Sequence, residues 1–287
     1  MADSFVLDPA LRRDPSPDRR TVLVTGAGGR IGSFFAEQYH DRYDLRLMVY
    51  KDEDVEAAEQ YGTVVRGDIT DVESIKPQFD GVDTVVHLAA SPSPATVWDT
   101  ALKLNIDGTY NVYVAARAAG CRRVVFASSI HAVSGYGRTR QVHADDPVNP
   151  GDVYGVSKCF GESMGRYMAE QQGLSVICIR IGAFQPLDTA KQRDSYKIMN
   201  AFVSKRDLAH LITCCIDNVD LRFAIVHGLS NNLFNRMDIS ETKMLVGYDP
   251  QDDFTELHPD LDKLDLRRRV TPHDEESGQE SGIRQDL

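Results

Sequence analysis

The stretch Thr21-Val22-Leu23-Val24-Thr25-Gly26-Ala27-Gly28-Gly29-Arg30-Ile31-Gly32 decides the fold. A short apolar run, typical of a strand, ends in a glycine-rich turn, and a helical pattern begins directly after it. Gly26 permits a tight turn, Gly29 lets the backbone approach a pyrophosphate, and Gly32 lets the helix pack close to the sheet. The N–H groups and the positive end of the helix dipole then face the phosphates. We therefore expect a dinucleotide-binding turn, with the cofactor against Gly26, Gly29, Arg30, Ile31 and Gly32.

The same alternation of strand and helix continues along the chain. Further strand-like apolar runs occupy 45–50, 63–66, 84–88, 123–128 and 175–180, and the clearest helical patterns occupy 31–40, 96–119 and 153–172. Continuous apolar strands that alternate with helices predict a parallel sheet that is buried on both faces. The expected fold class is α/β, a Rossmann-type doubly wound parallel sheet with helices on both faces and a small C-terminal substrate-binding region.

The two ends of the chain differ from its centre in composition. Residues 1–20 and 266–287 are rich in charged residues and proline and poor in apolar residues, so we expect a disordered leader and a disordered tail. Residues 21–265 are then one NAD(P)-binding domain, whose substrate-binding loops lie mainly in 183–260.

Composition excludes several classes of partner. The chain has 287 residues, 42% of them apolar, and a formal net charge of −11, which argues against a nucleic-acid binder. No apolar run approaches the roughly 18 residues that span a bilayer, and no signal peptide is present, so a cytoplasmic protein without a membrane partner is expected. The five cysteines are odd in number and lack CxxC spacing, which favours buried free thiols over a disulfide or metal site.

Two motifs follow the third and fourth predicted strands. Gly67-Asp68-Ile69 places a carboxylate where it could accept from an adenine amino group, although Asp68 could instead be a turn or helix-cap residue. His87-Leu88-Ala89-Ala90 ends the next strand with small residues, which leave room for ribose and phosphate. We expect Asp68, Ile69, Leu88, Ala89 and Ala90 at the cofactor.

Candidate catalytic groups follow in the second half of the predicted sheet. Asn105 lies inside a long helix with Gly108, and both are poor interior helix residues, which indicates a kink or a released backbone group. Ser129 ends the fifth strand, where its hydroxyl can donate to a substrate oxygen. Tyr154 and Lys158 lie four residues apart on one helical face, where an ammonium favours the phenolate and makes the tyrosine a usable base.

In combination these motifs resemble the extended short-chain dehydrogenase/reductase superfamily, also called the NAD-dependent epimerase/dehydratase family. The resemblance covers about residues 21–230 and rests on TGAGGRIG, GDI, HLAA, NIDGTYN, FASSI and YGVSK in the family's order. It implies NAD or NADP as cofactor, with Asn105, Tyr154, Lys158 and Ile181 also at the cofactor site. Tyr154 would abstract the hydroxyl proton, Ser129 would orient that hydroxyl, Lys158 would lower the Tyr154 pKa and bind the nicotinamide ribose, and Asn105 would support Lys158 through a water relay. The resemblance also implies a homodimer or higher homo-oligomer.

A narrower resemblance is to the uronate dehydrogenases, which oxidise the anomeric carbon of a hexuronic acid. It rests on FASSIHAVSGY, VYGVSKCFGE, RIGAFQP and FVSKRD. It implies that the substrate contacts Ser129, His131, Tyr154 and Ala183.

Three positions depart from the uronate pattern. Ile130 stands where those enzymes have asparagine, and Ala183 stands where they have serine. Their carboxylate-clamping arginine corresponds to Lys197, which lacks the planar fork that binds a carboxylate bidentately. Arg193 could supply that fork instead, so Arg193 and Lys197 are both candidate substrate ligands.

The sequence thus predicts an NAD(P)-dependent oxidoreductase that oxidises the anomeric carbon of a small sugar, a hexuronate or an aldose; a sugar phosphate would suit the same chemistry. One alternative is a nucleotide-sugar epimerase or dehydratase, which generally has a larger C-terminal region. Another is a non-catalytic protein that senses the dinucleotide. The choice between NAD and NADP stays open, because Lys51-Asp52-Glu53 offers both signs of charge near the tip of the second strand.

Overall fold

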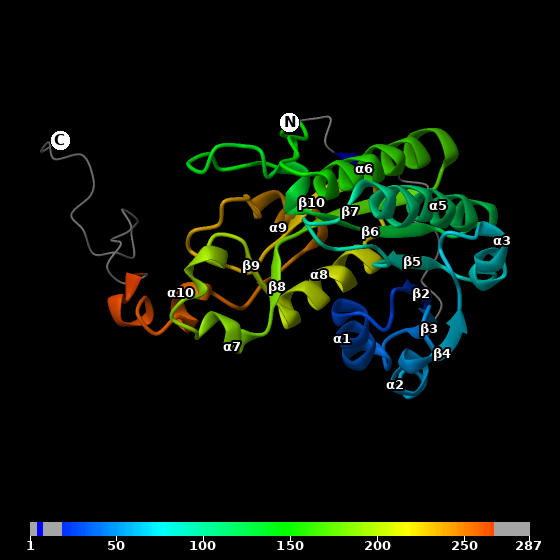
Figure 1. The fold of residues 1–287 in the computed structure, drawn as a ribbon, viewed down its shortest axis with the longest axis horizontal. Coiled ribbons are helices and arrows are strands. Elements are labelled where there is room, and N and C mark those ends of the chain that lie inside the picture. The colour runs from blue at the N-terminus through cyan, green and yellow to red at the C-terminus, as the bar shows by residue number, and fades with distance from the viewer. Residues whose placement is uncertain (1–4, 8–18, 267–287) are drawn as a thin grey trace, which may run out of the picture.

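Seven parallel strands form the central sheet in the computed structural model, which describes residues 5–7 and 19–266 (Figure 1). Their order is β10-β7-β6-β5-β2-β3-β4, and the order reverses at β2, which pairs with β3 on one side and β5 on the other. Ligands in doubly wound sheets bind beyond the carboxyl ends of the strands at this reversal. The strands are β2 (Thr21–Thr25), β3 (Asp44–Val49), β4 (Thr63–Arg66), β5 (Thr84–His87), β6 (Arg123–Ser129), β7 (Ser175–Ile181) and β10 (Leu221–Gly228).

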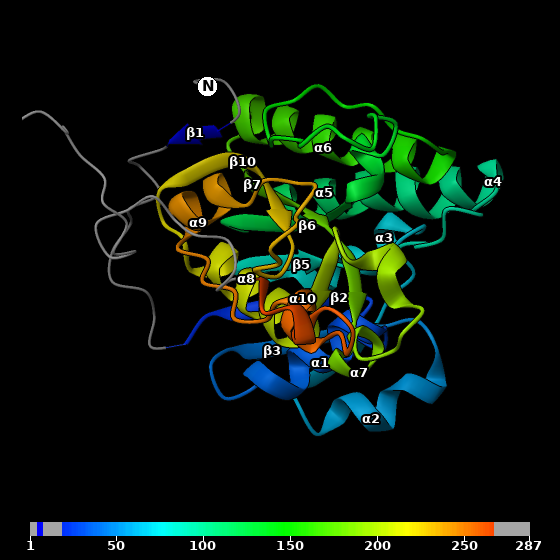
Figure 2. The same cartoon turned by 90° about the vertical axis from the view of Figure 1, so that its left-hand side faces the viewer.

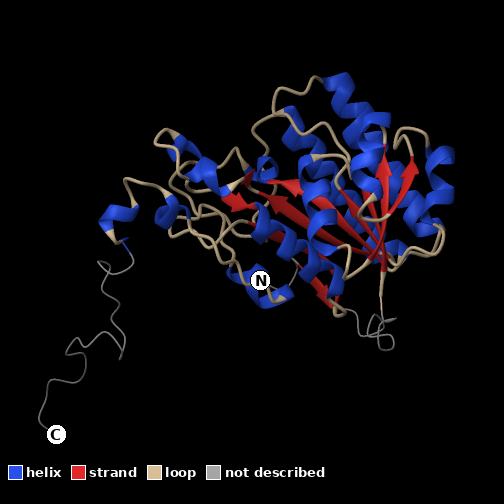
Figure 3. Ribbon diagram, turned by 90° about the horizontal axis from the view of Figure 1, so that it is seen from below, coloured by secondary structure: helices blue, strands red, loops and turns tan. Residues whose placement is uncertain are grey.

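Helices cover both faces of this sheet (Figures 1 and 3). On one face α5 and α6 pack over β5, β6 and β7 around Val85, Phe126 and Val176. On the other face α1 and α8 pack around Val24, Val125 and Ile179. Because β6 and β7 are buried along their whole length, both alternating sets of their side chains are apolar or internally paired. The helices of these layers are α1 (Arg30–Tyr39), α2 (Val55–Glu59), α3 (Val72–Ile75), α5 (Gly108–Ala118), α6 (Val153–Gln172) and α8 (Lys205–Asp217).

A smaller layer lies beyond the carboxyl ends of β6, β7 and β10 (Figures 1 and 2). Its two strands pair in parallel, and it has its own apolar cluster around Phe202 and Phe254. Its elements are β8 (Ala183–Gln185), β9 (Phe202–Ser204), α7 (Leu187–Ala190) and α10 (Phe254–Leu257), while α9 (Ser240–Val246) packs beside β10 and α8. The placing of the substrate-binding loops mainly in 183–260 stays a prediction; the same range also contains α8 and β10, which complete the doubly wound sheet.

The predicted strands and helices are confirmed to within one or two residues at each end. The expected disordered leader is wrong for Phe5–Leu7, which form β1 and pair antiparallel with β10. This pairing covers backbone groups that an edge strand would otherwise expose. The remainder of 1–18 and the tail from 267 lie outside the described residues. Across the residues that are described, no helix combines the length and apolar character needed to cross a membrane.

Candidate active site

The glycine turn after β2 has the geometry that its sequence predicts. Gly26 has a φ of +70°, and a side chain there would place Cβ 2.8 Å from the backbone nitrogen of Ala89. At Gly32 a Cβ would lie 2.6 Å from the Gly26 carbonyl oxygen, so α1 can start close to the turn only because this position is glycine. Gly29 directly precedes Arg30, the first residue of α1. The N-terminus of α1 therefore opens at the sheet's reversal point without a side chain between it and a ligand.

Two cavities lie at this turn. One has a volume of about 730 Å³ and the other about 500 Å³, and Gly26, Gly29, Ala89 and Ala90 line both. Their shared boundary therefore lies against the glycine turn. This shape fits a dinucleotide whose pyrophosphate crosses the turn and whose two nucleosides lie on either side.

The two cavities contain almost all the predicted cofactor residues. Asp68 and Ile69 line the larger cavity, and the smaller one is lined by Arg30, Ile31, Gly32, Leu88, Tyr154, Lys158 and Ile181. Asp68 also accepts hydrogen bonds from the backbone and hydroxyl of Thr70, at 2.9 and 2.8 Å. The helix cap belongs to Asp71, whose carboxylate accepts from Glu73 and Ser74. Asp68 is thus a turn residue on the cavity wall.

Tyr154 and Lys158 lie on the first turns of α6 and line the smaller cavity. The Lys158 Nζ lies 5.6 Å from the centre of the Tyr154 ring and 5.1 Å from that of Phe126. Burial lowers the pKa of Lys158 to about 8, against the opposing attraction of Glu162. The ammonium is therefore held beside the phenol on aromatic surface, with little contact with solvent.

The Tyr154 hydroxyl is harder to ionise than that of a free tyrosine. Burial raises the pKa of Tyr154, its interaction with the Ser129 hydroxyl opposes this rise, and the carboxylate of Asp152 adds to it. Ser129 Oγ also accepts the backbone N–H of His131, at 3.2 Å. The hydroxyls of Ser129 and Tyr154 therefore meet at one cavity wall, where added positive charge favours the phenolate.

His131 lines the same cavity and has a carboxylate partner that the sequence analysis missed. Its Nδ1 lies 2.6 Å from Oδ2 of Asp152, and its ring meets the Tyr154 ring edge-on with centres 5.4 Å apart. Oδ1 of Asp152 accepts the backbone N–H of Gly155, at 2.7 Å, and so caps α6. An aspartate just before the first residue of a helix is a readable capping pattern, but its bond to His131 crosses a gap of 21 residues.

The kink expected around Asn105 is confirmed as a π-helical segment, Ala101–Asp107, between α4 (Trp98–Thr100) and α5. The Asn105 amide oxygen accepts from the Ser91 backbone at 2.8 Å, and its nitrogen donates to the Ser91 carbonyl at 3.1 Å and to Ser157 Oγ at 3.0 Å. Asn105 therefore joins the loop after β5 to the helix that bears Lys158. It does not line either cavity, and its water relay to Lys158 stays a prediction.

The ends of β2 and β5 are tied together by a buried histidine that the sequence analysis gave no role. Thr25 Oγ1 accepts the Ala89 N–H at 3.2 Å and lies 2.8 Å from Nδ1 of His87, whose Nε2 lies 3.2 Å from Thr109 Oγ1. Burial, together with the charge of Lys158, lowers the pKa of His87 to about 3. A neutral His87 thus fixes the strand ends against α5.

The two predicted carboxylate ligands lie away from the cavities. Arg193 is exposed and forms an ion pair with Asp260 at 3.6 Å, and Lys197 is also exposed. The ring of the intervening Tyr196 packs at a tilt against that of His258, with ring centres 4.2 Å apart, which holds this segment against the α10 end of the smaller layer. The structure therefore does not bring Arg193 or Lys197 to the site that Ser129, His131, Tyr154 and Ala183 line.

That part of the cavity wall is instead formed by β8 and α1. Phe184 and Gln185 line the smaller cavity beside Ala183. Arg30 donates from Nη2 to the Phe184 carbonyl at 3.2 Å and to Gln185 Oε1 at 3.1 Å. The Arg30 guanidinium at this wall therefore already forms hydrogen bonds within the protein.

Known proteins resemble this chain along most of its length. The model of the family described as NAD dependent epimerase/dehydratase family matches residues 22–216. An NAD-dependent glucose-6-phosphate dehydrogenase from Haloferax volcanii is 35% identical over 85% of this chain and 98% of that protein. An L-arabinose 1-dehydrogenase (NAD(P)(+)) from the same organism is 32% identical over 80% of this chain and 96% of that protein. The crystal structure of uronate dehydrogenase from Agrobacterium tumefaciens superposes with a TM-score of 0.75 at 30% identity, and covers 90% of this chain and 92% of that one.

Proposed function

Because the chain belongs to the NAD dependent epimerase/dehydratase family, we propose that it is an NAD-dependent dehydrogenase that oxidises the anomeric carbon of a small sugar. The observation that carries this proposal is the meeting of Ser129, Tyr154 and Lys158 at one cavity that continues past the glycine turn. Three relatives that match nearly this whole chain are named as sugar dehydrogenases, and they differ from one another in the sugar.

The proposed reaction removes a hydride from C1 of the sugar and a proton from its C1 hydroxyl group, and leaves a lactone. When bound, the oxidised nicotinamide accepts the hydride at its ring. Tyr154 takes the hydroxyl proton, and Ser129 orients the hydroxyl toward it. The Ser129 hydroxyl opposes the burial that raises the Tyr154 pKa. We assign to Lys158, whose Nζ lies 5.6 Å from the centre of the Tyr154 ring, the positive charge that favours the phenolate as the proton moves.

We propose an aldose, free or phosphorylated, in preference to a hexuronate. Selective binding of a carboxylate favours a planar, bidentate guanidinium, yet Arg193 forms an ion pair with Asp260 and Arg30 bonds to Phe184 and Gln185. Ile130 and Ala183 remove two further polar groups from this wall. His131 and Gln185 remain to contact hydroxyl groups.

The experiment is a test of cofactor reduction by the purified chain with NAD or NADP. The sugars are glucose, arabinose, glucose 6-phosphate, glucuronate and UDP-glucose. We expect NADH to form with at least one of the first three at a higher kcat/KM than with glucuronate. No reduction with any sugar would overturn the proposal, and conversion of UDP-glucose without net reduction would identify an epimerase instead.

Tyr154→Phe separates catalysis from binding in the same assay. This variant keeps the ring that packs on His131 and loses the proton acceptor, so turnover should fall by roughly a thousandfold or more while NADH affinity is preserved. Loss of affinity together with turnover would assign Tyr154 a structural role. Unchanged affinity with no turnover in either protein would favour a non-catalytic sensor of the dinucleotide.

A further inference from the structure

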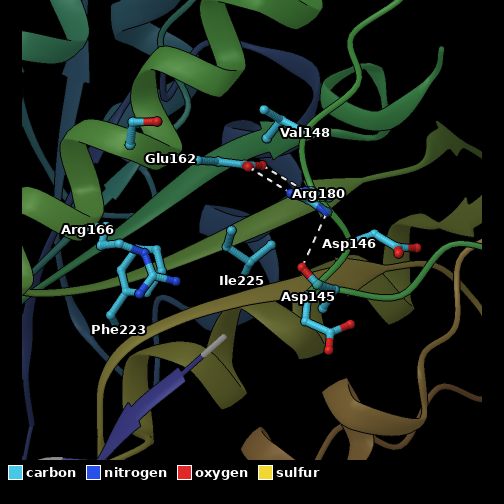
Figure 4. A pocket seen from close by; sticks show the side chains of 10 residues that line it. Asp145, Asp146, Val148, Glu162, Arg166, Arg180, Phe223 and Ile225 are labelled. Carbon is cyan, nitrogen blue, oxygen red and sulfur yellow. Dashed lines mark hydrogen bonds and ion pairs between the residues drawn. The ribbon is translucent and has the colours of Figure 1, made fainter. Parts of the chain in front are cut away.

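A buried carboxylate ties together three elements of the active site. Glu162 Oε1 accepts the hydroxyl of Ser128 at 2.6 Å. The two carboxylate oxygens of Glu162 also accept from Nε and Nη2 of Arg180, both at 2.9 Å (Figure 4). The side chains of Glu162 and Arg180 are 3% and 1% exposed. The triad Ser128, Glu162 and Arg180 thus links the carboxyl ends of β6 and β7 to α6.

Each member of this triad is a close neighbour of a residue at the cavity. Ser128 lines the smaller cavity and precedes Ser129. Arg180 precedes Ile181, which also lines it. Glu162 follows Lys158 by four residues on α6, so the two side chains lie on one helical face. On its other side the triad borders a separate cavity of about 550 Å³, toward Asp145 and Arg166 (Figure 4).

We propose that Glu162 is a positioning residue of the active site, whose carboxylate is the fixed counter-charge of Lys158 and the anchor of the Ser128–Ser129 strand end. The inference rests on the proposed function for its catalytic consequence. Its electrostatic content, the attraction of Glu162 for the charged form of Lys158, does not require turnover.

The surroundings of Lys158 leave Glu162 as the anion that favours its charged form. Ionisable groups around the pair are Tyr154 and Cys159 of α6, His87 of β5, Tyr113 of α5, and Cys178 and Arg180 of β7. Burial lowers the pKa of His87 and raises the pKa values of the tyrosines and cysteines, which keeps all of them neutral at pH 7. Among the described residues, the carboxylate whose attraction favours the charged form of Lys158 is therefore that of Glu162. Without it, burial alone would act on the ammonium, and less Lys158 would be charged.

The ion pair of Glu162 with Arg180 also stabilises the fold, and this structural role must be separated from the electrostatic effect of Glu162 on Lys158. Glu162→Gln alone leaves Arg180 buried without a counter-charge, which is strongly destabilising. The double variant Glu162→Gln with Arg180→Met removes both charges and keeps an acceptor for Ser128, a replacement that is often neutral for stability. Glu170→Gln is the matched control, because Glu170 is on the same helix and pairs with Arg166 at the surface.

The decisive measurement is an NMR titration of the Lys158 side chain in protein labelled with [ε-13C]lysine, with the signal assigned from Lys158→Met. In the double variant we expect the Lys158 midpoint to fall by roughly one pH unit or more, with the melting temperature close to that of the wild type. Glu170→Gln should leave the midpoint unchanged. An unchanged midpoint in the folded double variant would overturn the proposal and leave the triad as a structural ion pair.

Turnover provides the second readout. If Glu162 keeps Lys158 charged, the alkaline limb of the kcat/KM profile in the double variant should move to lower pH with the NMR midpoint. A profile that keeps its wild-type position while the midpoint moves would show that the charge of Lys158 does not limit catalysis, and would overturn the catalytic part. A wild-type protein that oxidises no sugar would overturn the proposed function. The titration would still decide whether Glu162 favours the charged form of Lys158.

Discussion

The carboxylate of Asp152 holds His131 by one oxygen, Oδ2 at 2.6 Å from Nδ1, and caps the helix that bears Tyr154 by the other. Because a carboxylate only accepts, Nδ1 of His131 carries the proton. In the neutral ring Nε2 is then an acceptor, suited to a sugar hydroxyl at the cavity. The side chain of Asp152 therefore sets both the start of α6 and the orientation of the His131 ring.

Asp152→Asn should invert the His131 tautomer without removing the cap. The asparagine oxygen can still accept from Gly155, whereas its NH2 group donates to Nδ1 and moves the ring proton to Nε2. We expect kcat/KM for the sugar to fall roughly tenfold to a hundredfold, the value of one lost hydrogen bond of about 1.5–3 kcal/mol. Steady-state kinetics measure the fall in kcat/KM, and a thermal melt checks that the helix cap is kept.

Asp152→Ser is the companion variant, because serine also caps helices but cannot reach His131 in the same way. It should lie between the wild type and Asp152→Asn in activity. If both variants lose stability and activity in parallel, the contribution of Asp152 is the helix cap alone.

Gly26→Ala should impair both folding and cofactor binding. Alanine at a φ of +70° costs about 1–2 kcal/mol, and its Cβ would in addition meet the backbone of Ala89 at 2.8 Å. Gly81→Ala is the matched control, since Gly81 has a φ of +69° with open space around it. In urea unfolding we expect both variants to lose a similar free energy of unfolding to backbone strain, and Gly26→Ala to lose more because of its contact with Ala89. NADH affinity should fall in Gly26→Ala alone. Equal behaviour of the two would mean that the approach to Ala89 is unimportant.

The sheet and its helices could be predicted because their signals are local. Arg123–Ser129 contains the apolar run 124–127 and is buried over its whole length, and Gly26 in the glycine turn has the positive φ that only glycine readily adopts. β8 and β9 were not predicted, because each has three residues and exists through pairing with the other.

The side-chain partners in the site were less readable than the backbone. Glu162 joins residues 34 and 18 positions away, and Asp152 reaches His131 across 21, so no spacing rule marks them. Lys197 was predicted from its correspondence to the arginine of the uronate dehydrogenases and Arg193 as a substitute for it, but the Tyr196 ring packs against that of His258 and holds this segment at α10. The motif order therefore predicts residues that share one cavity, Ser129, Tyr154 and Lys158, whereas Arg193 and Lys197 lie outside it.

Lys158 should lower the stability of the fold at neutral pH. Its pKa is about 8 in the folded chain and 10.5 ordinarily, so between these values the unfolded chain binds more protons than the folded one. The free energy of unfolding therefore rises with pH across this window, by up to about 3 kcal/mol. Lys158→Met should be more stable than the wild type at pH 7 by an amount of this order, and the difference should shrink toward pH 10.5. Urea titrations at several pH values measure it, and a difference that does not vary with pH would contradict the burial cost.

Asp54 should select NAD over NADP. It ends the 3-10 turn Asp52–Asp54 and lines the larger cavity, and its Cγ lies 2.3 Å from where a Cβ on Gly28 would stand. Its carboxylate therefore lies against the glycine turn, where it can accept from a ribose hydroxyl and would repel a 2′-phosphate. In this turn Asp52 pairs with Arg66 and Glu53 with Lys51, and Asp54 is the acid of the turn that lines the cavity, whose wall also includes Asp68 and Asp99.

Asp54→Asn removes this repulsion while nearly preserving the side chain's shape. We expect the ratio of kcat/KM for NADP to that for NAD to rise about tenfold, which corresponds to roughly 1.4 kcal/mol of lost discrimination. Glu56→Gln is the matched control, because it removes one exposed negative charge two residues away on α2, outside the cavity lining. A similar rise in both variants would reflect the general acidity of this surface, and an unchanged ratio in Asp54→Asn would place the selection of NAD elsewhere in the cavity.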